Sequence, residues 1–259
     1  MALDARMPSA SAAAPITKRT VPKQRDGRYF FCGMTILILA TVLLGFGKTY
    51  FLAGMFRAPL PSWIIHVHGA AFTSWIVLLI VQTSLITAGR VDIHRRLGMI
   101  GFGLACAMVV LGSMAATDLL RRAESAMSVD AKTFYAGTLG DMVIFAVLVF
   151  FAFRTRRNPA AHKRLILIAT ITLLGAPINR WPFPILLEKP ILIELIAYVF
   201  LLLLVFYDLW SRRNIHSATV WGGLFLIVMQ QLEFPIGSTA VWQRFATWML
   251  ARVTAIHGA

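Results

Sequence analysis

Long apolar segments alternate with short polar ones along most of the chain. Seven of them are long enough to cross a bilayer as helices, because about 20 apolar residues span its hydrocarbon core. They cover residues 29–49, 62–87, 97–117, 133–153, 164–180, 191–209 and 217–234. The pattern predicts an all-α polytopic membrane helix bundle with about seven transmembrane helices.

The two ends of the chain differ from this pattern. Residues 1–28 are rich in Ala, Ser, Pro and basic residues without apolar periodicity, which predicts a disordered basic tail. Residues 29–236 form the predicted seven-helix transmembrane domain. Residues 237–259 mix aromatic residues such as Trp242 with basic ones such as Arg244, a mixture typical of an interfacial amphipathic helix.

Composition excludes a water-soluble protein. Hydrophobic residues make up 58% of the chain and charged residues 14%, against roughly 25% charged in soluble proteins. The net charge of +14 is concentrated in short loops, so it does not indicate a nucleic-acid partner. Cys32 and Cys106 lie in separate apolar segments without a CxxC motif, which excludes a disulfide framework or a zinc ribbon.

Basic residues are unevenly divided between the two sides of the predicted bundle. Of the 25 Lys and Arg residues, sixteen fall on the side of the N-terminal tail and nine on the opposite side. Basic residues resist translocation, so this difference predicts a cytoplasmic N-terminus. Seven crossings then place the C-terminus outside.

Asp141 is the acid predicted to lie nearest the membrane midplane. It is about eight residues into the fourth predicted helix, which corresponds to a depth of about 12 Å. A charged carboxylate near the bilayer centre costs roughly 2.5–3.5 kcal/mol, so Asp141 needs a partner. The candidate partners are His66, His68 and Arg180. Asp141 forms either a structural bond to a histidine or to Arg180 that fixes helix packing, or a ligand or proton-relay site.

These acids and histidines also suggest a metal site on the side opposite the tail. The candidate ligands are His66, His68, Asp141 and Glu194. Residues i and i+2 point in nearly opposite directions on a helix, so the two histidines cannot both reach one ion from regular helix. One imidazole with Asp141 and Glu194 would suit a divalent ion such as copper or zinc.

Three further histidines form a ring on the other side. His94, His162 and His216 each precede or begin a predicted helix beside Arg or Lys. The helix dipole and the neighbouring cations disfavour an imidazolium there, and a neutral imidazole can ligate a metal or haem iron. One haem between His94 and His162 or His216 is thus a hypothesis. The alternative is that the ring only contacts anionic headgroups.

Motifs of several common protein classes are missing. The chain has no GxSxG, HExxH or GxxxxGK[ST] element, so hydrolases and NTPases have no support. A retinal protein needs a lysine in its last helix, and no lysine follows Lys189. Whether the protein is an enzyme stays open.

Three short elements carry a resemblance to known proteins. They are His66-Val67-His68-Gly69, His94-Arg95-Arg96-Leu97-Gly98 and His162-Lys163-Arg164-Leu165. The chain resembles bacterial multi-pass membrane proteins of unknown function, and it is distantly similar to families that include an assembly factor for haem-copper oxidases. The resemblance covers predicted helices 2 to 5, where His66, His68, His94 and His162 match. It implies a bacterial inner-membrane protein with a redox or metal-handling role.

Three functions follow from these observations. The first is a membrane protein that binds a haem or copper ion through His and Asp, or that assists a respiratory complex. The second is a proton-coupled carrier of a small molecule, in which Asp141 and a histidine share the proton. The third is a structural protein without a cofactor, whose partner is the lipid bilayer.

Overall fold

The computed structural model of the chain describes residues 27–52, 62–123 and 130–257, and these residues form helices without strands. The helices are α1 (Arg28–Phe46), the π-helix η1 (Gly47–Phe51), α2 (Trp63–Thr87), α3 (Val91–Ala123), α4 (Ala131–Arg154), α5 (Pro159–Thr172), α6 (Gly175–Ile178), α7 (Ile185–Glu188), α8 (Ile191–Arg212), α9 (Ser217–Gly237) and α10 (Ala240–His257). Residues 1–26 of the predicted tail lie outside the described residues.

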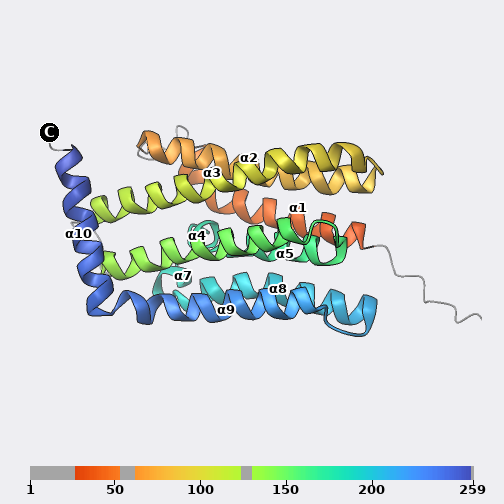
Figure 1. Cartoon of the computed structure of the whole chain (residues 1–259). Coiled ribbons are helices and arrows are strands. Elements are labelled where there is room, and N and C mark those ends of the chain that lie inside the picture. Colours follow the sequence, from red (N-terminus) through yellow and green to blue (C-terminus); the bar gives the residue numbers. More distant parts are fainter. Residues whose placement is uncertain (1–26, 53–61, 124–129, 258–259) are drawn as a thin grey trace, which may run out of the picture.

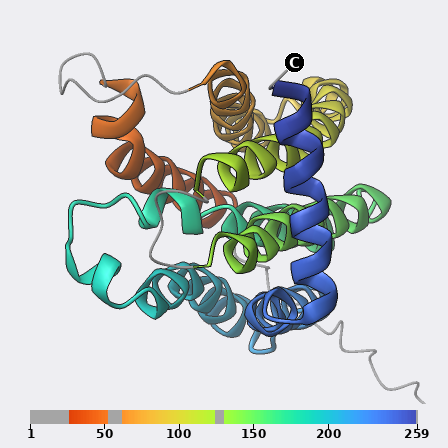
Figure 2. The same ribbon diagram turned by 90° about the vertical axis from the view of Figure 1, so that its left-hand side faces the viewer.

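Seven helical segments of the described chain are long and apolar enough to cross a membrane, with α5 and α6 together forming the fifth. They run side by side, alternately in opposite directions (Figure 1). This confirms the predicted all-α bundle and makes the chain a multi-pass membrane protein. The predicted interfacial segment contains the helix α10, which crosses one end of the bundle (Figure 2).

The two ends of the bundle have different components. The basic end, as we call it, holds the start of α1 and the turns from α2 to α3, α4 to α5 and α8 to α9, including Arg90, Arg156 and Arg213. The opposite end, called the α10 end, holds α10 and the short helices α6 and α7 (Figure 1). The cytoplasmic location of the N-terminus stays a prediction from the sequence.

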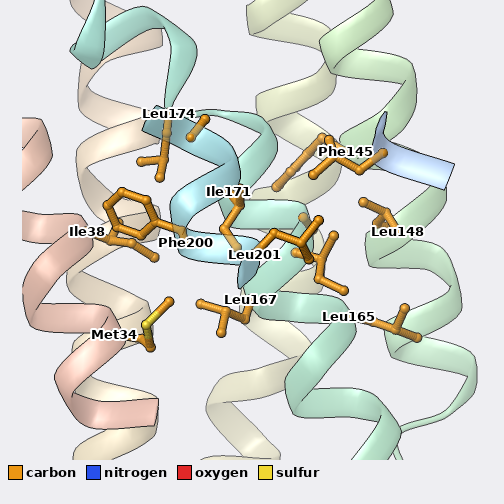
Figure 3. Close-up of a cluster of buried hydrophobic side chains, with 14 of the residues drawn as sticks. Met34, Ile38, Phe145, Leu148, Leu165, Leu167, Ile171, Leu174, Phe200 and Leu201 are labelled. Atoms are coloured by element: carbon orange, nitrogen blue, oxygen red, sulfur yellow. The ribbon is translucent and has the colours of Figure 1, made fainter. Parts of the chain in front are cut away.

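Helix α5 lies at the centre of the bundle. Within the most apolar window of its span 67% of residues are buried, against 17–39% in the other six spans. Leu167 and Ile171 of α5 pack with Ile38 of α1, Phe145 of α4 and Phe200 of α8 (Figure 3). The other helices therefore surround α5, and most of its surface contacts protein.

The fifth crossing is interrupted near the α10 end. Helix α5 ends at Thr172 and the chain continues as the short helix α6. Pro177 explains the break, because proline lacks the N–H for a helical hydrogen bond and its ring clashes with the carbonyl four residues earlier. The carbonyl of Pro177 lies so close to Gly45 of α1 that a Cβ at position 45 would clash with it.

Helix α10 is fixed to the bundle by apolar and polar contacts. Its Ala246 and Leu250 are buried against Leu120 of α3 and Tyr135 of α4. The indole N–H of Trp242 donates to the backbone carbonyl at the start of α4, with a distance of 2.7 Å. The ends of α3 and α4 thereby position α10 across the bundle.

Candidate functional site

Three acidic side chains come together in the half of the bundle nearer α10. Asp141 of α4, Glu194 of α8 and Glu233 of α9 are close enough to influence one another electrostatically, and we call them the carboxyl cluster. Two glutamines of α9 donate to it: Gln230 Nε2 lies 3.0 Å from Asp141 Oδ1, and Gln231 Nε2 lies 2.9 Å from Glu194 Oε2. The cluster thus joins α4, α8 and α9.

Glu233 lies directly against the backbone of α4. A Cβ on Gly140 would clash with its carboxyl group, and a Cβ on Gly137 would lie 3.3 Å from its Oε2. Its Oε1 atom is buried and has no hydrogen-bond partner. The two glycines, one helical turn apart, therefore make room for an acid whose polar atom is left unsatisfied.

The carboxyl cluster has no basic partner among the described residues. The ion pairs found there join Arg90 to Asp92, Arg121 and Arg122 to Asp118, and Arg164 to Asp208. Like charges in a membrane-spanning segment repel one another strongly when no opposite charge lies beside them. Binding of a proton within the cluster relieves this repulsion.

The suggested ion pair between Asp141 and Arg180 is not among the ion pairs of the described residues. Asp141 accepts its hydrogen bond from Gln230 instead. Arg180 donates to the carbonyl of Ala176, at 2.7 Å, and its guanidinium lies 4.9 Å from the ring centroid of Phe46 in α1. Because α5 ends early and the chain turns at α6, Arg180 is directed toward α1.

The two histidines of α2 have separate surroundings. The hydroxyl of Tyr50 lies 3.3 Å from Nδ1 of the exposed His66. His68 packs on Phe72 with ring centroids 4.1 Å apart. In the described part of the chain no group of three or more His, Cys, Asp or Glu side chains is arranged to hold a metal ion. The predicted ligands His66, His68, Asp141 and Glu194 are therefore not gathered at one centre.

Two members of the predicted histidine ring do meet at the basic end. The ring centroids of His94 in α3 and His162 in α5 are 6.5 Å apart, with the planes nearly perpendicular. Nδ1 of His162 donates to the carbonyl of Ala152, at 2.8 Å. Because a carbonyl only accepts, this bond leaves Nε2 of a neutral His162 with a free lone pair.

The surroundings of this histidine pair contain unsatisfied polar atoms. Nδ1 of His94 is buried and has no hydrogen-bond partner. Gln82 of α2 donates to the carbonyl of His94 at 3.2 Å, while its own Oε1 is also buried and unpartnered. Such buried atoms require an explanation, and a bound water or ion is one.

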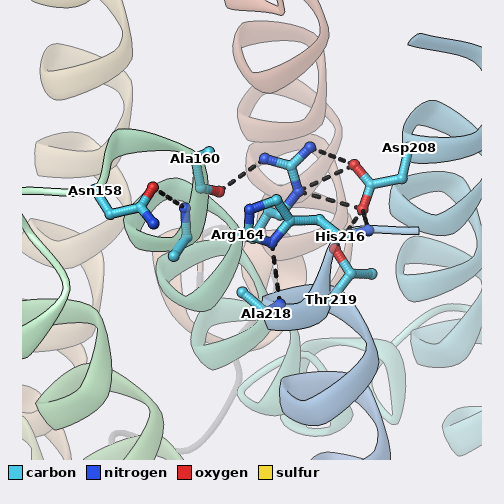
Figure 4. Close-up of polar contacts among 8 residues, drawn as sticks. Asn158, Ala160, Arg164, Asp208, His216, Ala218 and Thr219 are labelled. Atoms are coloured by element: carbon cyan, nitrogen blue, oxygen red, sulfur yellow. Dashed lines mark hydrogen bonds and ion pairs between the residues drawn. The ribbon is translucent and has the colours of Figure 1, made fainter. Parts of the chain in front are cut away.

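His216 has a different role from the other two. It is the N-cap of α9, where its Nδ1 accepts a hydrogen bond from the N–H of Ala218, at 3.0 Å (Figure 4). Burial and the nearby Arg164 guanidinium lower the pKa of His216, which keeps the ring in the neutral form that can accept this bond. The structure thus explains His216 as a helix cap.

A buried ion pair beside His216 was not predicted as a site. Arg164 of α5 and Asp208 of α8 are 2% and 0% exposed, and the guanidinium donates to both carboxylate oxygens (Figure 4). Asp208 also accepts from the hydroxyl of Thr219, at 2.6 Å, and from the N–H of His216, at 3.1 Å. The pair connects α5, α8 and α9 and leaves neither charge uncompensated.

With these sites established, the chain was compared with known proteins. It matches no protein-family model, no curated protein and no solved structure.

Proposed function

We propose that the protein is a proton-coupled membrane carrier in which the carboxyl cluster binds the transported proton. The observation that carries the proposal is the meeting of Asp141, Glu194 and Glu233 within membrane-spanning helices, without a basic partner among the described residues. Ionisable groups inside a membrane are costly and are found on proton and substrate pathways. A proton-coupled carrier needs such groups, which explains why they are present despite their energetic cost.

The structure of α9 supports this role. Pro235 lies inside the helix two residues after Glu233. Because proline has no N–H, the carbonyl of Gln231 lacks its usual helical donor. This carbonyl adds an acceptor next to the cluster, and backbone carbonyls without a helical donor coordinate ions in transporters. The proton partner of Asp141 in this proposal is a carboxyl group in place of the expected histidine.

Infrared difference spectroscopy tests the proton site without knowledge of the substrate. Spectra of the reconstituted protein in acidic and alkaline buffer should show a protonated-carboxyl band that Glu233→Gln or Asp141→Asn weakens. Asp92→Asn is the control, since Asp92 is exposed at the basic end and its carboxylate lies 3.8 Å from Arg90 Nε. A band unaffected by both cluster variants would refute the proton site.

Transport itself requires a second measurement. Liposomes containing the protein and a pH-sensitive dye are screened with small molecules, and a coupled substrate should change the internal pH. Asp141→Asn should abolish this change while the protein still inserts. If the same variant still transports the substrate with the same change in internal pH, Asp141 does not carry the coupled proton.

We infer a second function, metal binding, for the pair formed by His94 and His162. The free lone pair of His162 Nε2 and the unpartnered Nδ1 of His94 are suitable donors for an ion such as copper. The bond from His162 to the Ala152 carbonyl is the type of outer contact that orients metal-ligating histidines. Copper bound at this pair would be consistent with a protein that assists a respiratory complex. Haem is the alternative ligand.

Elemental analysis and the visible spectrum of the purified protein test this second function. Copper or zinc bound at about one equivalent should be lost in His94→Gln and in His162→Gln. His66→Gln is the control because His66 is exposed and far along α2 from Gln82. A Soret band that both variants abolish would identify haem instead of a free ion, and protein containing neither metal nor haem would exclude the function.

A further inference from the structure

A groove lies between the start of α4 and α10. It has a volume of about 450 Å³ and is lined by Lys132, Gln243, Arg244, Thr247, Trp248 and Ala251. Volumes of roughly 300–1,000 Å³ are typical of sites for small molecules. We propose that this groove binds the headgroup of an anionic phospholipid.

The charges of the groove fit a phosphate. Lys132 and Arg244 line it, and no carboxylate does. Asp130 is close in sequence, but its carboxylate accepts hydrogen bonds from the N–H of Lys132, at 3.2 Å, and from Gln243, at 2.7 Å. Neither cation takes part in the ion pairs found among the described residues. Two positive charges are therefore available to an anion.

The exposed face of α10 distinguishes a lipid from a soluble anion. Val241, Phe245 and Trp248 are 78%, 37% and 52% exposed, and they recur at i, i+4 and i+7, which places them on one side of the helix. Acyl chains cover such an apolar face, whereas a free phosphate leaves it in water. Trp248 belongs to both the groove and this face, so the headgroup and its chains would be bound side by side.

The location of α10 places the groove at headgroup level. The helix crosses the bundle where the membrane-spanning helices α3, α4 and α9 end (Figure 2). Aromatic and basic side chains are enriched at this level of a bilayer. The bond from the Trp242 indole to the Lys132 carbonyl fixes the two sides of the groove relative to each other.

Native mass spectrometry of the purified full chain, titrated with phosphatidylglycerol or phosphatidylcholine, tests the proposal. The wild type should retain phosphatidylglycerol preferentially. Lys132→Gln/Arg244→Gln should weaken that binding on the order of tenfold or more, because each basic residue contributes to attraction of anionic lipid. Arg157→Gln/Arg213→Gln removes the same number of exposed charges from the basic end and should leave the groove lipid bound.

Several results would overturn the proposal. Equal weakening by both double variants would mean general attraction to the basic protein. Equal retention of the two lipids would exclude recognition of a negative headgroup. Displacement of phosphatidylglycerol by inorganic phosphate from the wild type and the control variant alike would identify a soluble anion as the ligand. The exchange Lys132→Arg/Arg244→Lys keeps both charges and should preserve binding, so its loss would also refute the role of charge.

Discussion

Helices α8 and α9 have polar contacts near both of their ends, and the two ends differ. At the basic end, Asp208 of α8 receives the guanidinium of Arg164 and the hydroxyl of Thr219 in α9. Nearer α10, Glu194 of α8 and Glu233 of α9 meet Asp141, a third acid. At the basic end, α8 and α9 are therefore joined through an acid that Arg164 of α5 neutralises, whereas nearer α10 they are brought together with like charges.

This difference separates a structural site from the proposed proton site. The ion pair of Arg164 and Asp208 is fully buried and hydrogen-bonded, so no further ligand is needed there. The carboxyl cluster includes a buried oxygen of Glu233 without a partner. A bound proton would satisfy the second site, whereas protonation of Asp208 would disrupt the first. We therefore expect α8 and α9 to remain fixed at the basic end while the carboxyl cluster changes its protonation.

The largest predicted effect comes from leaving one buried charge alone. Arg164→Met leaves the buried Asp208 without an opposite charge and should destabilise the protein by about 3–5 kcal/mol, measured as thermal or denaturant unfolding in detergent micelles. The double variant Arg164→Met/Asp208→Leu replaces both charges and should recover most of this loss. If the double variant is as unstable as the single one, the uncompensated charge is not the cause.

Gly140→Ala should have the next largest effect. The new methyl group would occupy the position of the Glu233 carboxyl group, so the side chain must move away from α4. We expect a loss of about 1–3 kcal/mol, as for other overpacked sites, and a changed infrared carboxyl band. Gly103→Ala is the control, since its Cβ would meet no atom within 4 Å. Equal effects of the two substitutions would contradict the close approach of Glu233.

The carboxylate of Asp130, just before α4, is exposed and lies outside the carboxyl cluster. The Thr133 hydroxyl is the main cause that lowers the pKa of Asp130, and it is followed by Gln243 and backbone N–H groups at the start of α4. A depressed pKa stabilises the fold above the pKa of the unfolded chain and loses this effect as the pH falls. Asp130→Ala should cost about 0.5–2 kcal/mol at neutral pH.

The pH dependence provides the check on this prediction. The difference in melting temperature between wild type and Asp130→Ala should be constant near neutral pH and shrink below about pH 4, where Asp is protonated in the unfolded chain. A difference that grows on acidification would have the opposite sign to the one expected.

Neutralising the carboxyl cluster should change stability least. Glu233→Gln removes one of three mutually repelling carboxyl groups and keeps the size of the side chain, so we expect a change within about 1 kcal/mol in either direction. Unfolding in the same micelles as for Arg164→Met allows a direct comparison. A loss similar to that of Arg164→Met would make both regions structural and remove the contrast between them.

Hydropathy predicted the number and order of the crossings, but it located their ends less well. The crossing predicted over residues 97–117 is the helix Val91–Ala123, because charged residues such as Asp92 and Arg121 extend the helix beyond the apolar part. The crossing predicted over residues 164–180 is Pro159–Ile178, which consists of α5 and α6 with a break after Thr172. Hydropathy detects the part of a helix inside the bilayer, not its full length.

The sequence indicated the acids of the site but not their partners. Depth along a helix identified Asp141, and it also suggested Arg180 at a similar level. Which way a side chain faces depends on packing, and here α9 packs along α4, placing Gln230 and Glu233 beside Asp141. When hydrophobic residues lie on all sides of a membrane helix, their pattern does not show which side faces a given neighbouring helix. The Gly137–Gly140 spacing was the available indication of a close neighbour.

The central position of α5 has a consequence for how the protein is made. Arg164 emerges from the ribosome 44 residues before Asp208, the residue that later neutralises it. Until α8 follows, the fifth segment has a basic side chain without its acceptor and an apolar surface without its final neighbours. We expect α5 to be held in a hairpin with α4 near the translocon, and its firm integration to await synthesis of α8.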